Sequence, residues 1–385
     1  MTSREDRTGF IAGGTWCADH NKLIERWPEE EELVLILGEE VRGGGPACNL
    51  AIGVKRLDPQ IPVATIGLLG QDSDGHILQE QAQREGLDCS GLLMLEGHRT
   101  TFTDAFTAQD NDRRTHLYYP GTSGILTPDH FDFSDTNARI LHLGLPGLHE
   151  RMDAAWKNEP NGWVAVLRKA QSAGIETNLE MCSLPPEQLS RIVAPCLTHL
   201  DYLIINEFEV AALAGRPIMP GAETDIDACV ANARDVLEAG AMRLIVAHFP
   251  SGSVAIGRGA TPLITPSVHI PKDAIAGSNG AGDAFACGVL YGMHQSWALD
   301  ATLQLAHTVV IHCHTEVVAD ALGTGGGYEW PSKNSIAPKL QLASKIELSE
   351  IVPNRFRITQ LTFLEQWRID RKMIYEIVIH SYEKL

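Results

Sequence analysis

Between residues 138 and 257 the sequence alternates short apolar runs with stretches of helical character. Four of these runs have the composition of buried strands: residues 140–143, 175–178, 202–205 and 244–247. Strands separated by helices imply right-handed crossovers and therefore a parallel sheet. Ligands bind to such sheets at the carboxyl ends of the strands. The pattern thus predicts an α/β fold and the edge of the sheet at which a site would lie.

Length and charge limit the classes of function. A chain of 385 residues is long enough for one large α/β unit, and 31 Lys and Arg against 49 Asp and Glu give a net charge of −18. Such a surface repels nucleic acid and anionic membranes, so we expect neither as a partner. The eight cysteines are scattered without paired spacing, and there is no basic, apolar leader or long apolar run. These features are typical of a cytoplasmic protein with free thiols.

Near the carboxyl end, three small residues precede a carboxylate: Gly280, Ala281, Gly282 and Asp283. Apolar residues at helical spacing follow, which predicts a loop that opens a helix. Backbone N–H groups of such a loop, together with the first helical turn, can hold an anion. A carboxylate beside an anion is repelled unless it has a chemical role, such as taking a proton from an attacking hydroxyl. Asp283 is therefore either a catalytic base or a helix cap.

Residues 278–283, Ser-Asn-Gly-Ala-Gly-Asp, resemble the carboxyl-terminal signature of the ribokinase-like (PfkB) family of sugar and nucleoside kinases. Two further regions are similar to that family in the right order: Gly14 with Asp19, and Gly44 and Gly45 with Asn49. The resemblance covers residues 8–330. It implies a three-layer α/β/α fold with a central, mostly parallel sheet and a small β lid, formed within residues 10–45 and 95–120. Residues 331–385 are interpreted as a carboxyl-terminal extension of unknown role.

The resemblance implies transfer of the γ-phosphoryl group of ATP to a hydroxymethyl group of a sugar or nucleoside. By this resemblance, the acceptor would be bound by Asp19, Gly44, Gly45 and Asn49. Asp283 would remove its proton, and the backbone from Asn279 to Gly282 would stabilise the charge of the phosphoryl group. Each assignment has a structural alternative. Asp19 is also compatible with an ordinary turn, and Asn49 with a position inside a helix. Family members often pair through the lid, so a homodimer is expected.

Asn206 and Glu209 follow the predicted strand at 202–205. Their Asn-x-x-Glu spacing is similar to a family element that organises phosphate and Mg²⁺, often through water, so ATP and Mg²⁺ are the expected cofactors. The alternative is a helix N-cap with an acidic first turn. Asp72, in a stretch similar to Gly-x-x-Gly-x-Asp-x-x-Gly, is predicted to cap a helix.

Two departures from the family concern cofactors. Where relatives have Thr-x-Gly-x-x-Gly against the nucleotide, this chain has residues 247–252, Ala-His-Phe-Pro-Ser-Gly, and only Gly252 remains as a nucleotide contact. Phe249 must therefore reshape or fill part of that pocket. Gly277 stands where the signature begins with Asp, which makes an activating monovalent cation doubtful. These changes motivate a competing hypothesis, a non-catalytic sugar- or nucleotide-binding protein on the kinase fold.

Two other chemistries are disfavoured. His312 and His314 lie two apart in a predicted helix and would point in different directions, so they do not suit one metal ion. A nicotinamide-dependent oxidoreductase would need Gly-x-Gly-x-x-Gly after the first strand, and residues 13–18 do not supply it.

Overall fold

The computed structural model describes residues 7–111, 113–182, 184–218, 224–267 and 280–321, with side chains as far as residue 311. These side chains belong to one compact unit, Met1–Val268 with Ser278–His314. Three kinds of sequence prediction lie outside the described residues: those for Gly277 and Asn279, for the side chains of His312 and His314, and for the extension from 331 to 385.

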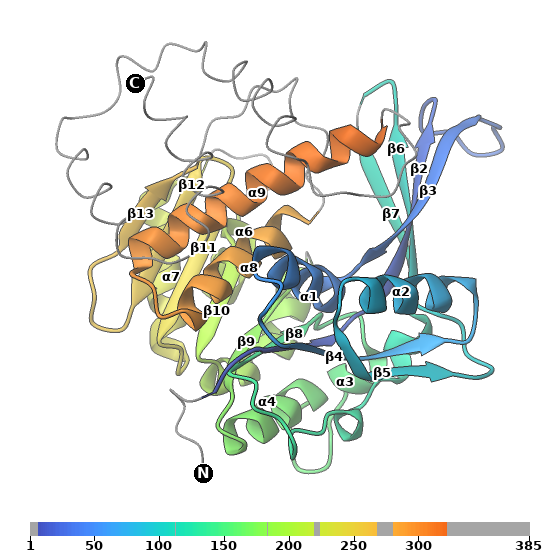
Figure 1. Ribbon diagram of the computed structural model, residues 1–385. Coiled ribbons are helices and arrows are strands. Elements are labelled where there is room, and N and C mark those ends of the chain that lie inside the picture. The colour runs from blue at the N-terminus through green and yellow to red at the C-terminus, as the bar shows by residue number, and fades with distance from the viewer. Residues whose placement is uncertain (1–6, 112, 183, 219–223, 268–279, 322–385) are drawn as a thin grey trace. The chain divides into compact units, whose positions relative to one another are not determined.

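Nine described strands form the large sheet, in the order β13-β12-β11-β10-β9-β8-β1-β4-β5 (Figure 1). The seven from β11 to β5 run parallel, while β12 and β13 add an antiparallel edge. Their bounds are β1 Phe10–Gly14, β4 Val63–Gly70, β5 Asp88–Leu95, β8 Ile140–Gly144, β9 Glu176–Leu179, β10 Tyr202–Asn206, β11 Leu244–Phe249, β12 Gly252–Gly257 and β13 Leu263–Pro266. The four predicted buried strands are confirmed as β8 to β11.

Helices cover both faces of this sheet, with α1 and α8 on one side and α3 and α4 on the other (Figure 1). The described α-helices are α1 Pro46–Leu57, α2 Ser73–Arg84, α3 Glu150–Asp153, α4 Gly162–Ser172, α5 Pro186–Val193, α6 Glu207–Leu213, α7 Ile226–Ala239, α8 Ala281–His294 and α9 Leu299–Ala321. Short 3₁₀ turns span Gly121–Ile125, Pro128–His130 and Ala194–His199. None of the helices in this part of the chain combines the length and apolar character needed to cross a membrane.

The core is built from side chains that alternate along strands and recur every three or four residues along helices. In α4, for example, Trp163, Val164 and Leu167 are buried against the sheet, together with Leu203 of β10. Burial of apolar side chains on both faces of the parallel strands explains why these strands are continuous apolar runs.

A second sheet has the order β3-β2-β6-β7, with bounds β2 Cys17–Ile24, β3 Ile36–Gly44, β6 Phe102–Ala108 and β7 Arg114–Tyr119. It is mixed, because β2 runs parallel to β6 and antiparallel to β3. β6 and β7 pair antiparallel as a hairpin, within the range 95–120 in which lid strands were expected. The large mostly parallel sheet and this small mixed sheet agree with the predicted α/β fold with a small β lid.

The ordinary-turn alternative for Asp19 is wrong. β1 ends at Gly14 and β2 begins at Cys17. Asp19 is therefore on a strand of the small sheet and is no ordinary turn residue. The chain passes directly from one sheet to the other here, which carries Asp19 from the end of β1 into the lid.

Candidate active site

Asp19 and the Gly44–Gly45 pair form one wall of the site. Gly44 packs so closely on Asp19 that a Cβ there would overlap the carboxylate. Gly45 has φ of +84°, and its Cβ would lie 2.6 Å from the carbonyl oxygen of Thr15, so both positions exclude a side chain. The sequence placed these residues together only through their order in the chain. The structure brings them into contact because β3, which ends at Gly44, pairs with β2, which carries Asp19.

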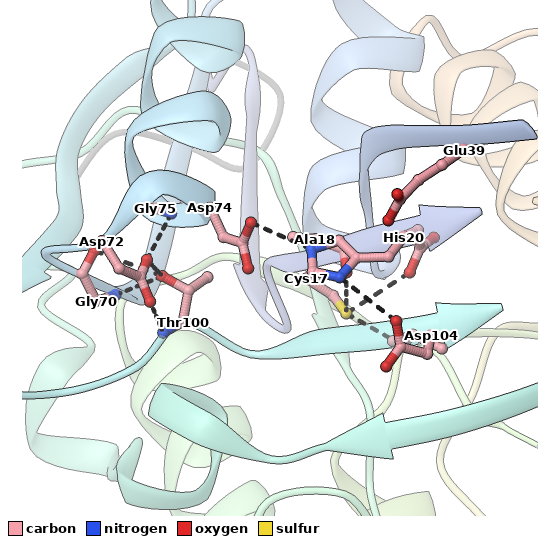
Figure 2. A network of polar contacts seen from close by, with 12 residues as sticks. Cys17, Ala18, His20, Glu39, Gly70, Asp72, Asp74, Gly75, Thr100 and Asp104 are labelled. Carbon is pink, nitrogen blue, oxygen red and sulfur yellow. Dashed lines mark hydrogen bonds and ion pairs between the residues drawn. The ribbon is translucent and has the colours of Figure 1, made fainter. Parts of the chain in front are cut away.

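The lid strand β2 is anchored to the main body through the residue next to Asp19. His20 Nε2 lies 3.1 Å from Asp74 Oδ1 of α2, and His20 Nδ1 lies 3.5 Å from Asp104 Oδ1 of β6 (Figure 2). Lys22 also pairs with Asp104. Successive strand side chains point to opposite faces, so the face with His20 holds the lid in place while the face with Asp19 is turned the other way.

Asp72 makes the predicted cap of α2 and links it to the lid. Its Oδ1 accepts from the N–H of Gly75 at 2.9 Å, and its Oδ2 accepts from the N–H of Thr100 at 2.8 Å (Figure 2). The Thr100 hydroxyl donates to Asp72 Oδ1 at 2.6 Å. Because Thr100 leads into β6, one carboxylate fixes both the helix start and the entry to a lid strand.

Asn49 and Asp283 meet across 234 positions of sequence. Asn49 lies in the first turns of α1, and its Nδ2 donates to Asp283 Oδ2 at 2.7 Å. Burial raises the pKa of Asp283, and the bond from Asn49 opposes that rise. The two glycine-rich signatures therefore converge on one carboxylate, which is partly buried and has an amide donor that favours its ionised form.

Asp283 does not cap α8. The N-cap is Gly280 with φ of +72°, and Asp283 stands three residues further on. Glycine supplies no side-chain acceptor, so the N–H groups of the first turn are left for another partner. The sequence left two alternatives for Asp283, a catalytic base or a helix cap. The geometry excludes the cap. Asp283 is therefore a carboxylate beside a helix N-terminus of the kind that binds anions.

Asn206 and Glu209 form a capping box at the start of α6. Asn206 Oδ1 accepts from the N–H of Glu209 at 2.9 Å, and Glu209 Oε2 accepts from the N–H of Asn206 at 3.1 Å. The structural alternative for these residues is therefore present. Oε1 of Glu209 is not part of the box, and burial raises the pKa of this carboxyl to about 7.

The departure at residues 247–252 has a structural explanation. Phe249 is 7% exposed and belongs to the apolar core, while His248 lies beside α8, 3.7 Å from where a Cβ on Gly282 would be. Gly252 is required by the sheet, because a Cβ there would lie 2.5 Å from the carbonyl oxygen of Thr265. His248, which the sequence analysis did not single out, is thus the side chain of this segment that borders the amino-terminal end of α8.

Two more charged residues near the site were missed. Glu180 directly follows β9, and it acts electrostatically with Asp283 and Glu209; the rule that sites lie after parallel strands could have found it. Arg114 of β7 shares a lid face with Asp19 by strand register. Its positive charge lowers the pKa of Asp19, whereas burial raises that pKa to about 6. No motif marks Arg114, because only strand pairing brings it there.

Known proteins resemble this chain over most of its length. The family model described as pfkB family carbohydrate kinase matches residues 17–310. An ATP-dependent ribose-1-phosphate kinase of Halopiger xanaduensis is 24% identical over 82% of this chain and 92% of its own. An adenosine kinase of Schizophyllum commune is 24% identical over 75% of this chain and 88% of its own.

Solved structures show the same fold. Ribokinase of Arabidopsis thaliana, complexed with ribose and ATP, superposes with a TM-score of 0.64 at 20% identity, over 83% of this chain and all of that one. Ribokinase of Thermotoga maritima gives a TM-score of 0.65 at 15% identity, over 87% of this chain and 99% of that one.

Proposed function

This chain belongs to the pfkB family of carbohydrate kinases, and from that premise we propose that it transfers the γ-phosphoryl group of ATP to a hydroxymethyl group of a sugar or nucleoside. The observation that carries this proposal is the 2.7 Å hydrogen bond from Asn49 to Asp283. It joins the helix behind the glycine pair to the helix whose N-terminus can bind phosphate.

On the acceptor side, Asp19 can accept hydrogen bonds from two hydroxyl groups, because an ionised carboxylate has two acceptor oxygens. Gly44 and Gly45 let a ring lie against the backbone. The amide oxygen of Asn49 is available to a hydroxyl while Nδ2 holds Asp283. The lid over these groups would exclude water, which otherwise competes as phosphoryl acceptor.

In the transfer, Asp283 removes the proton of the acceptor hydroxyl. That oxygen forms a bond to the γ-phosphorus while the bond from phosphorus to the β–γ bridging oxygen breaks, so that ADP leaves and the proton stays on Asp283. Backbone N–H groups at Gly280, Ala281 and Gly282 would donate to the oxygens of the phosphoryl group in flight, together with Asn279, which lies outside the described residues. One such donor is typically worth about 3–4 kcal/mol.

Magnesium fits the acidic side of this site. Glu209 offers an oxygen outside its capping box, and Asn206 fixes that carboxylate through its backbone N–H. Mg²⁺ prefers oxygen ligands and keeps several waters, so these two residues would hold it through water. When bound, the ion neutralises phosphate charge.

The first test is ADP release from ATP and Mg²⁺ across a panel of sugars and nucleosides, with Asp283→Asn beside the wild type. Asp227→Asn is the matched control, because Asp227 is an exposed carboxylate in the first turn of α7. General-base catalysis contributes roughly 100- to 10,000-fold. Asp283→Asn should therefore lose at least about 100-fold in kcat, with acceptor binding retained and the control unaffected.

Two results would contradict the proposal. Full turnover in Asp283→Asn would remove Asp283 as the base. Binding of acceptor and of ATP with Mg²⁺, without ADP release on any acceptor of the panel, would favour the non-catalytic binding protein.

A further inference from the structure

Three polar atoms at the carboxyl ends of β8 and β9 are buried without a hydrogen-bond partner among the described residues: His142 Nε2, Asn178 Oδ1 and Glu180 Oε2. His142 and Asn178 are fully buried, and Glu180 is 6% exposed. An unsatisfied buried polar group costs free energy that a protein normally avoids. Three of them on adjacent strands, at the edge of the sheet where ligands bind, indicate a site that a ligand completes.

The contacts of His142 show that it is an uncharged neighbour of Glu180. Its Nδ1 lies 2.9 Å from Asn178 Nδ2; with the amide as donor, Nδ1 accepts and Nε2 carries the ring proton. Nε2 faces Glu180 Oε2 at 4.0 Å, which is too long for a hydrogen bond. Burial lowers the pKa of His142 to about 3, so the ring is neutral. His142 therefore directs an uncharged Nε2–H towards Glu180 and does not neutralise that carboxylate.

The charges that act most strongly on Glu180 among the described residues are negative. Burial raises its pKa most, and the negative charges of Asp283 and then Glu209 raise it further. Among the described residues, no Lys or Arg forms an ion pair with Glu180, Glu209 or Asp283. Three carboxylates that act on one another without a fixed cation require a positive ligand for all of them to ionise.

We propose that Glu180, positioned by His142, is a further binding residue for the divalent cation that accompanies the nucleotide, in addition to Glu209. The described residues contain no group of three or more acidic, histidine or cysteine side chains placed to ligate a metal directly. Glu180 therefore acts through a water of the ion, in keeping with the hydration that Mg²⁺ retains beside phosphate. This inference rests on the proposed kinase function.

The test measures binding of Mn²⁺, as the probe, by electron paramagnetic resonance with the β,γ-methylene analogue of ATP present. Glu180→Gln is compared with Glu187→Gln, the same change at an exposed glutamate in the first turn of α5. We expect Glu180→Gln to weaken Mn²⁺ binding at least tenfold without changing affinity for the metal-free analogue, and Glu187→Gln to match the wild type. Equal Mn²⁺ affinity in all three proteins would overturn the assignment of Glu180 and leave the kinase proposal standing. A wild type that binds neither Mn²⁺ nor the analogue would instead refute both.

Stability of the metal-free protein separates this role from a structural one. Because Glu180→Gln removes an unpartnered buried carboxylate, its Tm should equal or exceed that of the wild type. A clear fall in Tm with unchanged Mn²⁺ affinity would make Glu180 a structural residue. His142→Gln should weaken Mn²⁺ binding by less than Glu180→Gln does, since it leaves the carboxylate in place but loses its orientation; no change at all would remove His142 as the positioning residue.

Discussion

Gly44 leaves room for the Asp19 carboxylate because it has no side chain. A Cβ at Gly44 would overlap that carboxylate, whereas a Cβ at Gly38 of the same strand would meet open space. We expect Gly44→Ala to raise the acceptor KM about tenfold or more, a change of about 1.4 kcal/mol, because the added methyl group displaces the Asp19 carboxylate that is proposed to bind the acceptor. Gly38→Ala is the control and should leave KM unchanged; similar kinetics in both variants would mean that the close contact has no part in acceptor binding.

Asp19 also predicts a pH dependence. Burial and the charge of Asp283 raise its pKa to about 6, although its contact with Cys17 opposes this. Only the ionised form accepts two hydroxyl donors, so acceptor affinity should be constant above pH 6 and fall as the pH drops through about 6. Acceptor Kd, measured without nucleotide from pH 5 to 8, tests this. In Asp19→Asn the affinity should be weaker and independent of pH over this range; an unchanged acid limb in that variant would assign it to another group.

At the scale of elements, the lid face that carries Asp19 on β2 also carries Arg114 on β7, two strands away in the sheet. The positive charge of Arg114 lowers the pKa of Asp19, so Arg114→Gln should move the acid limb of acceptor binding to higher pH. Arg113→Gln, one residue away on the exposed turn before β7, is the control. The measurement is acceptor Kd as a function of pH in both variants. Coincident curves for Arg114→Gln and the wild type would show that Arg114 does not act on Asp19.

The start of α2 joins secondary structure to the lid. Asp72 accepts three hydrogen bonds, from Gly75 and from the backbone and side chain of Thr100, whereas the cap of α7, Asp225, accepts one from Ala228. Loss of an N-cap costs about 0.5–2 kcal/mol of stability. We therefore expect Asp72→Ala to lower the free energy of unfolding by an amount at or above the upper end of this range, and Asp225→Ala by an amount near its middle. Urea unfolding gives both values; equal losses would mean that the bonds to Thr100 contribute nothing net.

For the whole molecule, we predict a homodimer formed through the lid. Large apolar side chains of this region are exposed, including Leu35 at 57%, Ile36 at 54% and Leu117 at 54%. Apolar surface of this kind marks interaction sites. Leu117→Lys should shift the mass from analytical ultracentrifugation towards the monomer, while Ile264→Lys, an equally drastic change at a 49% exposed residue of β13, should not. A wild type that is monomeric at all concentrations would contradict the prediction.

Much of this molecule was predictable because its signals are local. Apolar runs specified β8 to β11, the Asp72 cap followed from helix chemistry, and the glycine-rich stretches marked both ends of the site. Predictions failed where a strand leaves one sheet for another. The passage from β1 to β2 has the small residues of a turn, and only pairing with β3 and β6 makes it extended.

The sequence by itself determined the order of the strands and helices, the acidic surface and the identity of the two signatures, because periodicity, charge and glycine content are properties of neighbouring residues. Only the tertiary structure decided that Asn49 reaches Asp283, that Asp283 is no cap, and that Asn206 and Glu209 cap α6. It alone placed Glu180 and His142 beside the site. The contacts of Asn49 with Asp283 and of His142 with Glu180 join residues far apart in the chain, and the two local caps were open alternatives in the sequence that only coordinates could separate.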